Sequence, residues 1–172
     1  MKQHVLLVGL PGSGKTTVGR LVADQLHAGF VDVDAILVRR EGKPIDVIFG
    51  EQGESAFREM ERRETEAALA NDPAVIAPGG GWAAQPGALA AAKQRALVIY
   101  LCSRPDTAAR RAAPEGNRPL LMGLDPVTRM RELLKQREPF YRDAHAHVVT
   151  DGKAPEQVAD EVARLAQTKG GW

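Results

Sequence analysis

The run GLPGSGKT at residues 9–16 is the feature that most constrains this chain. The residues before it, 4–8, are apolar and rich in β-branched side chains, which is typical of a buried strand. The residues after it, 17–27, place apolar side chains at helical spacing. A strand, a glycine turn and a helix N-terminus together present backbone N–H groups and partial positive charge to an anion. The segment therefore predicts a loop that binds nucleotide phosphates.

Lys15 and Thr16 carry the chemistry of this loop. The Lys15 ammonium can reach the β- and γ-phosphates of a nucleotide, and the Thr16 hydroxyl can ligate Mg²⁺. The loop glycines let the backbone approach phosphate because no Cβ intervenes. A plain turn before a helix is the competing interpretation, and the flanking strand and helix disfavour it.

Composition restricts the class of protein. The chain has 172 residues, 44% of them hydrophobic and 26% charged, so we expect a single domain with a substantial core. A net charge of +1 argues against a dedicated nucleic-acid surface. We see no secretory signal and no apolar run near the ~18 residues that span a membrane, so we expect a cytoplasmic protein. The single cysteine, Cys102, ends an apolar run and is interpreted as a small core residue.

Apolar, β-rich runs alternate with helical patterns along the chain. This alternation predicts a parallel sheet with helices on both faces, a three-layer α/β/α sandwich. We expect five strands, at residues 4–8, 30–33, 74–77, 97–101 and 147–149. Helical spacing predicts helices at 15–27, 35–40, 54–70, 86–92, 106–111, 126–138 and 155–167.

Two stretches interrupt the alternation, at about residues 34–70 and 112–123. The first is mostly helical and separates the second and third strands. The second holds two prolines and two glycines, so it cannot be one regular element. Because ligands of open α/β sheets bind beyond the carboxyl ends of the strands, we expect an acceptor-binding insertion in the first stretch and a lid in the second.

Asp32 and Asp34 close the second predicted strand. Residues two apart in extended backbone point to the same side, so both carboxylates should face the ligand cleft while Val33 faces the core. One carboxylate could hold Mg²⁺ through water, and the other could accept a proton from an attacking hydroxyl. The alternative role for Asp34 is to cap the following helix.

Arg58 and the glycine triplet at 79–81 are further candidates for ligand binding. Arg58 lies on a densely charged helix, where Arg62 and Arg63 compete for any anion-binding role and a solvated face is the alternative. The triplet follows the third strand, where glycines let a backbone pass close to a ligand and donate N–H groups. A flexible turn is the alternative for the triplet.

Arginines in the second half of the chain could bind phosphate or carboxylate. Arg110, Arg111 and Arg118 lie in or beside the second interrupting stretch, where they could neutralise charge on the ATP phosphates. Arg137 lies near the end of the next helix and could hold a carboxylate bidentately, with Tyr141 just beyond it. Each arginine taken alone is more often a surface charge.

These segments together resemble the shikimate kinases. They come in the family's order and at its spacing across almost the whole chain. The segments that carry the resemblance are the glycine run 9–16, Asp32 and Asp34, Ile48-Phe49 … Gly53-Glu54 … Phe57-Arg58, the triplet 79–81, Arg118-Pro119-Leu120-Leu121, and Arg137 … Tyr141.

The resemblance implies a phosphate-loop kinase fold with strand order 2-3-1-4-5. It implies an enzyme that transfers phosphate from ATP to the shikimate 3-hydroxyl, giving shikimate 3-phosphate and ADP on the path to chorismate and aromatic amino acids. One Mg²⁺ ion would accompany ATP. The partners would be ATP and shikimate, with no nucleic acid and no membrane, and we expect a monomer.

The resemblance also implies roles for individual residues. Shikimate would be bound by Asp34, Arg58, Gly79, Gly80, Gly81 and Arg137. ATP would be bound by Gly12, Ser13, Gly14, Lys15, Thr16, Thr17, Arg111, Arg118 and Lys153. Thr16 and, through water, Asp32 would hold the metal. The catalytic residues would be Asp34, Lys15 and Arg118.

Two residues beside the triplet depart from the family pattern. Pro78 precedes the triplet where a more flexible residue is usual. Trp82 follows it where a small residue is usual, so its side chain either crowds the acceptor pocket or points away from it.

Residue chemistry alone leaves other functions open. A kinase for gluconate or a nucleoside monophosphate shares the phosphate loop, although the two aspartates, the triplet and the 118–121 run disfavour it. A switch GTPase is disfavoured because a guanine-reading N-K-x-D run is absent. A catalytically silent nucleotide-binding module is disfavoured because Lys15, Thr16 and both aspartates are intact.

Overall fold

A computed structural model describes residues 1–112 and 125–172. Its sheet has five strands, all parallel, in the order β2-β3-β1-β4-β5. The strands are β1 (His4–Val8), β2 (Phe30–Asp32), β3 (Val75–Ala77), β4 (Ala96–Cys102) and β5 (Ala146–Val149). The predicted fold class and strand order are confirmed.

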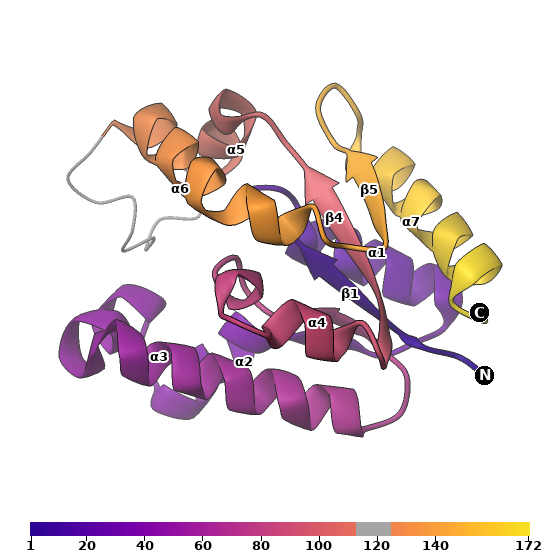
Figure 1. Cartoon of the computed structure of the whole chain (residues 1–172), viewed down its shortest axis with the longest axis horizontal. Coiled ribbons are helices and arrows are strands. Elements are labelled where there is room, and N and C mark those ends of the chain that lie inside the picture. The colour runs from indigo at the N-terminus through magenta and orange to yellow at the C-terminus, as the bar shows by residue number, and fades with distance from the viewer. Residues whose placement is uncertain (113–124) are drawn as a thin grey trace.

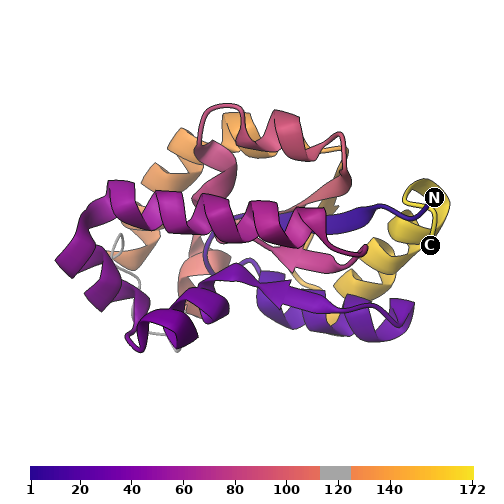
Figure 2. The ribbon, with the colours of Figure 1, turned by 90° about the horizontal axis from the view of Figure 1, so that it is seen from below.

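Helices cover both faces of the sheet, as Figures 1 and 2 show. One face carries α1 (Lys15–Leu26) and α7 (Pro155–Lys169), which contact each other. The other face carries α2 (Val33–Glu41), α3 (Ile45–Ala70), the 3₁₀ turn η1 (Trp82–Ala84), α4 (Ala88–Ala92), α5 (Pro105–Ala112) and α6 (Pro126–Tyr141).

The alternation of side chains along β1 explains why the core has two layers. Leu6 and Val8 pack into the cluster under α2–α6, whereas Val5 and Leu7 pack into the cluster under α1 and α7. Successive side chains of a strand point to opposite faces, so a central strand that is apolar at every position needs cover on both sides. All five residues of β1 are buried, which places the phosphate loop on a rigid base.

α3 is interrupted at Gly53. The backbone of Gly53 has φ +85° and ψ 165°, so the helical stretch is two segments that meet at a bend. A positive φ favours glycine over residues with a Cβ. The segment before the bend begins at Pro44 and Ile45, which line the cleft. The segment after the bend carries Arg58.

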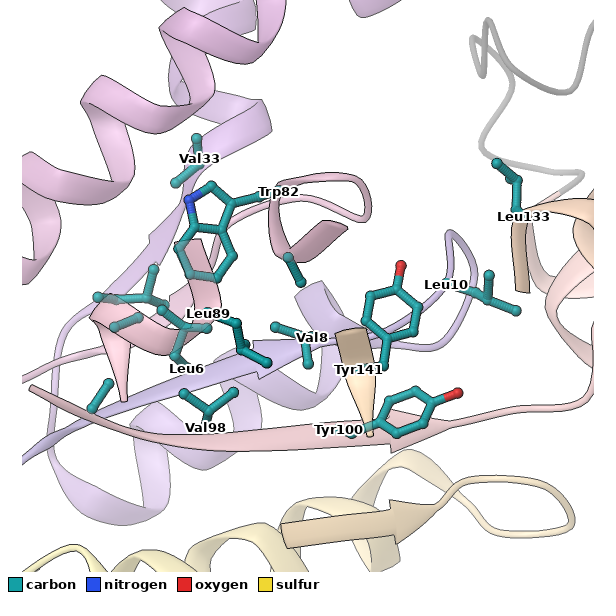
Figure 3. Packing of buried hydrophobic residues seen from close by; sticks show 14 of the residues in the cluster. Leu6, Val8, Leu10, Val33, Trp82, Leu89, Val98, Tyr100, Leu133 and Tyr141 are labelled. Atoms are coloured by element: carbon teal, nitrogen blue, oxygen red, sulfur yellow. The ribbon is translucent and has the colours of Figure 1, made fainter. Parts of the chain in front are cut away.

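Trp82 and Cys102 both have packing roles in the structure. Trp82 is 3% exposed and lies in the core with Leu6 and Leu89, so it does not crowd the cleft (Figure 3). Cys102 is half-buried at the end of β4, and burial raises the pKa of its thiol to about 11. A protonated thiol is a poor nucleophile, in agreement with the interpretation of Cys102 as a packing residue. Within residues 1–112 and 125–172, no helix has the length and hydrophobicity to cross a bilayer.

Candidate active site

The phosphate loop joins β1 to α1 in the geometry that binds an anion. Gly12 and Gly14 have φ of +79° and +98°, so both positions require the left-handed freedom of glycine. Gly14 is the N-cap of α1, which directs the helix N-terminus at the loop. A Cβ on Gly12 would collide with the Ala108 carbonyl of α5, so the loop lies directly against that helix.

Lys15 and Thr16 lie at the start of α1. Lys15 Nζ donates hydrogen bonds to the carbonyl oxygens of Gly9 (2.8 Å) and Leu10 (2.9 Å), which holds the ammonium over the loop. The Thr16 hydroxyl donates to Asp32 Oδ2 at 2.9 Å. Thr16 and Asp32 are the two side chains that the sequence assigned to the metal, and the structure brings them into contact. Mg²⁺ keeps several waters, so two oxygen ligands from a protein suit it.

Asp34 reaches the cleft from a helix and not from extended backbone, so that part of the prediction is wrong. β2 ends at Asp32, whose Oδ1 accepts the Ala35 N–H at 3.2 Å and caps α2. This cap starts the helix at Val33 and places Asp34 in its first turn. Both carboxylates still line the same cleft, and Val33 is fully buried as predicted.

The glycine triplet passes through a group of buried charges. An added Cβ on Gly79 would meet the carboxylates of Glu61 and Asp34, and one on Gly80 would lie 3.0 Å from an Arg137 guanidinium nitrogen. The guanidinium of Arg58 lies against Gly81, 2.5–2.7 Å from where its Cβ would be. Glycines at these three positions let charged side chains from α2, α3 and α6 pack against this backbone, and Gly79 also has a positive φ of +97°.

Arg58 is the arginine of α3 that faces the site. Its side chain is 12% exposed, whereas those of Arg62 and Arg63 are 57% and 74% exposed and pair with Glu59. Arg58 donates to Glu61 Oε1 at 2.9 Å. Burial therefore selects Arg58, and not Arg62 or Arg63, as the candidate for anion binding.

Glu61 is a site residue that the sequence interpretation missed. Its side chain is 2% exposed. Burial raises the pKa of this carboxyl to about 7, with Asp34 adding to the rise and Arg58 and Arg137 opposing it. The available signal was its position on the buried stripe of α3, where it follows Phe57 by four residues and precedes Thr65 by four. A glutamate on such a stripe needs a buried partner.

Two adjoining pockets share the phosphate loop. The larger, about 480 Å³, extends from the loop past Asp32 and Asp34 to Gly79 and Gly80. The smaller, about 320 Å³, lies on the other side of the loop and is lined by Arg111 and Lys153. Arg111 donates to the Thr150 hydroxyl at 3.0 Å and to its carbonyl at 3.1 Å, and Lys153 pairs with Glu161 at 2.8 Å. The phosphate loop therefore lies between the two pockets. The larger pocket suits a phosphoryl acceptor, and the smaller pocket suits a nucleoside.

Arg118 and residues 113–123 of the expected lid lie outside the described residues. The other residues assigned from the sequence, from Gly12 to Lys153, line these two pockets or surround the triplet. Such an arrangement can bring a nucleotide phosphate to a hydroxyl that is held beside a carboxylate and two arginines.

Comparison with known proteins identifies the family. The sequence model of the shikimate kinases matches residues 11–167. The chain belongs to the shikimate kinase family. It is 45% identical over 165 residues to the shikimate kinase of Salinispora arenicola, covering 93% of this chain and 95% of the relative.

Solved structures support both the family and the fold. A shikimate kinase from Acinetobacter baumannii, determined in complex with shikimate, superposes with a TM-score of 0.92 at 35% identity, covering 98% of this chain and 94% of that one. A gluconokinase from Sinorhizobium meliloti reaches a TM-score of 0.68 at 15% identity, covering 99% and 94%. At that identity the likeness shows only a common fold. This shikimate kinase family member is therefore a phosphate-loop kinase.

Proposed function

We propose that this protein transfers the γ-phosphoryl group of ATP to the 3-hydroxyl of shikimate, giving shikimate 3-phosphate and ADP. The observation that carries the proposal is the convergence of Arg58 and Arg137 on the glycine triplet, whose Gly79 and Gly80 line the same pocket as the phosphate loop. Two guanidinium groups suit a small acceptor with a carboxylate. The Acinetobacter baumannii relative was determined with shikimate bound, which supports the choice of acceptor.

The acceptor would occupy the larger pocket. Arg58 and Arg137 would hold its carboxylate, and the N–H groups of the triplet 79–81 would donate to the hydroxyl oxygens on its ring. Asp34 would orient the hydroxyl and take its proton as the oxygen forms a bond to the γ-phosphorus. The bond between that phosphorus and the bridging oxygen breaks, and ADP leaves with the electron pair.

ATP would bind across the phosphate loop. The loop residues Gly12, Ser13, Gly14, Lys15, Thr16 and Thr17 would hold its phosphates, with the adenosine in the smaller pocket beside Arg111 and Lys153. Lys15 would stay against the transferred group and, with Arg118, neutralise charge in the transition state. Thr16 and Asp32 would hold Mg²⁺, which supplies positive charge to the phosphates. We also propose that the protein is a cytoplasmic monomer.

An assay of acceptor choice tests the proposal. ADP release is followed with shikimate, quinate, gluconate and a nucleoside monophosphate at equal concentration. We expect shikimate to give a kcat/KM at least ~100-fold above that of each other acceptor, and product analysis to show the phosphate on the 3-hydroxyl. A kcat/KM for gluconate above that for shikimate would refute the proposal and indicate a different small-molecule kinase.

A further inference from the structure

Tyr141 links α6 to the glycine triplet. It is the last residue of α6, is fully buried, and donates a hydrogen bond from its hydroxyl to the Gly80 carbonyl. Its ring packs against Tyr100 with centroids 5.1 Å apart. Figure 3 shows the two hydroxyls pointing in different directions from this ring pair. Ring packing alone would be satisfied by phenylalanine, so the hydroxyl of Tyr141 has a separate role.

The hydrogen bond fixes one peptide plane. In a trans peptide the carbonyl of Gly80 and the N–H of Gly81 point to opposite sides. With the carbonyl held by the buried Tyr141, the Gly81 N–H points away from that ring. A reversed peptide would present a carbonyl oxygen in place of that N–H, so the acceptor would meet an oxygen where it needs a donor. Glycines impose little restraint on such a rotation, so an outside group is needed to prevent it.

The same hydroxyl lies beside the arginine of its own helix. Arg137 precedes Tyr141 by four residues, which places both on one side of α6. An Arg137 guanidinium nitrogen lies 3.0 Å from where a Cβ on Gly80 would be, and the guanidinium is close enough to the Tyr141 hydroxyl to influence its ionisation. Burial raises the pKa of Tyr141, with Arg137 and Arg58 opposing the rise, so the hydroxyl remains a proton donor.

We propose that Tyr141 is a positioning residue for the acceptor, which acts by holding the Gly80–Gly81 peptide so that the Gly81 N–H faces the acceptor beside Arg137. It acts through Gly80 and touches neither ATP nor the reacting atoms. The inference rests on the proposed function, because it takes the triplet and Arg137 to be where shikimate binds.

Tyr141→Phe tests this role, with Tyr100→Phe as a matched control. Each substitution removes one hydroxyl from the same buried ring pair. The Tyr100 hydroxyl is 3.4 Å from Glu138 and away from the triplet, so its loss should leave acceptor binding unchanged. We expect Tyr141→Phe to raise the KM for shikimate about tenfold. This is the size of effect expected when the buried Gly80 carbonyl loses its hydrogen-bond donor. The KM for ATP should stay within about twofold in both variants.

The outcomes separate the inference from the proposed function. Wild-type enzyme without shikimate turnover would overturn the proposed function. An active wild type whose Tyr141→Phe variant keeps its KM for shikimate would overturn the positioning role alone. Equal rises in KM for the Tyr141 and Tyr100 variants would also overturn it, because ring packing would then explain both.

A measurement on the wild type keeps the inference testable if the Tyr141→Phe variant does not fold. Labelling glycine with both ¹³C at the carbonyl and ¹⁵N selects amides that follow another glycine, namely Gly80, Gly81 and Gly171. Gly171 packs on Met1, far from the cleft, and serves as an internal reference. Shikimate should shift the Gly81 signal and leave Gly171 in place. A Gly81 signal that does not respond to saturating shikimate would refute the proposed orientation.

Discussion

Glu61→Gln should make the protein less sensitive to rising pH. Glu61 is buried against Arg58, and burial raises the pKa of its carboxyl from the usual 4.5 to about 7. Between these two values the folded protein holds a proton that the unfolded chain has released. The free energy of unfolding therefore falls as pH rises through this range. Glutamine keeps the shape of the protonated carboxyl and cannot ionise, so the variant should lack this decline.

The size of the effect follows from the two pKa values. A pKa raised from 4.5 to about 7 corresponds to about 3 kcal/mol of preference for the neutral form. The free energy of unfolding of Glu61→Gln, relative to wild type, should thus rise by roughly 2 to 3 kcal/mol between pH 5 and pH 8, which is most of the full effect. Other titrating groups cancel in this difference, because both proteins contain them.

Urea titrations of both proteins at half-unit steps from pH 5 to pH 8 provide the measurement. Glu59→Gln is a control on the same helix. The side chain of Glu59 is 45% exposed, and Arg62 and Arg63 lower its pKa to about 2, so it does not titrate in this window. Its difference from wild type should stay constant with pH. Parallel curves for wild type and Glu61→Gln would show that Glu61 is already ionised at pH 5, and the argument from burial would fail.

Substitutions at four further residues test the assigned roles. Lys15→Met should reduce ADP release at least ~100-fold while the melting temperature stays within about 4 °C, and a variant that retains most of its activity would refute the role of Lys15. Arg137→Ala should raise the KM for shikimate roughly 10- to 100-fold and barely change the KM for ATP. Arg118→Ala should instead change the KM for ATP or kcat. The same kinetic profile in both variants would contradict the assignment of Arg137 to shikimate and Arg118 to ATP. Asp34→Asn should lower kcat by roughly 10²–10⁴, and if asparagine retains near-normal kcat while Asp34→Ala does not, Asp34 positions the hydroxyl without removing its proton.

The sheet and the phosphate loop were predictable because their signals are local. An apolar strand, positive-φ glycines and an amphipathic helix occupy consecutive residues, and each reports on its own backbone. The placement of Asp34 was not predictable in the same way. Asp32 can end a strand or cap a helix, and only the hydrogen bond from the Ala35 N–H shows that it caps α2.

The buried charges were only partly predictable because they depend on tertiary contacts. Helix α3 carries charges on several sides, so its sequence did not separate Arg58 from Arg62 and Arg63. The separation comes from contact between Arg58 and a glycine triplet that lies more than twenty residues later in the chain. Glu61 was missed for the same reason, since a glutamate on a charged helix is usually solvated.

The bend at Gly53 gives this scaffold a way to vary during evolution. Among the residues that the structure describes, none beyond its chain neighbours places an atom within 4 Å of where a Cβ on this exposed glycine would be, so a replacement there meets backbone strain and no steric block from them. A change at this position would redirect the helical segment that leads from Pro44 and Ile45, which line the cleft. The arginines and carboxylates beyond the bend would keep their places. Selection could thus alter the size of acceptor admitted without touching the chemistry that phosphorylates it.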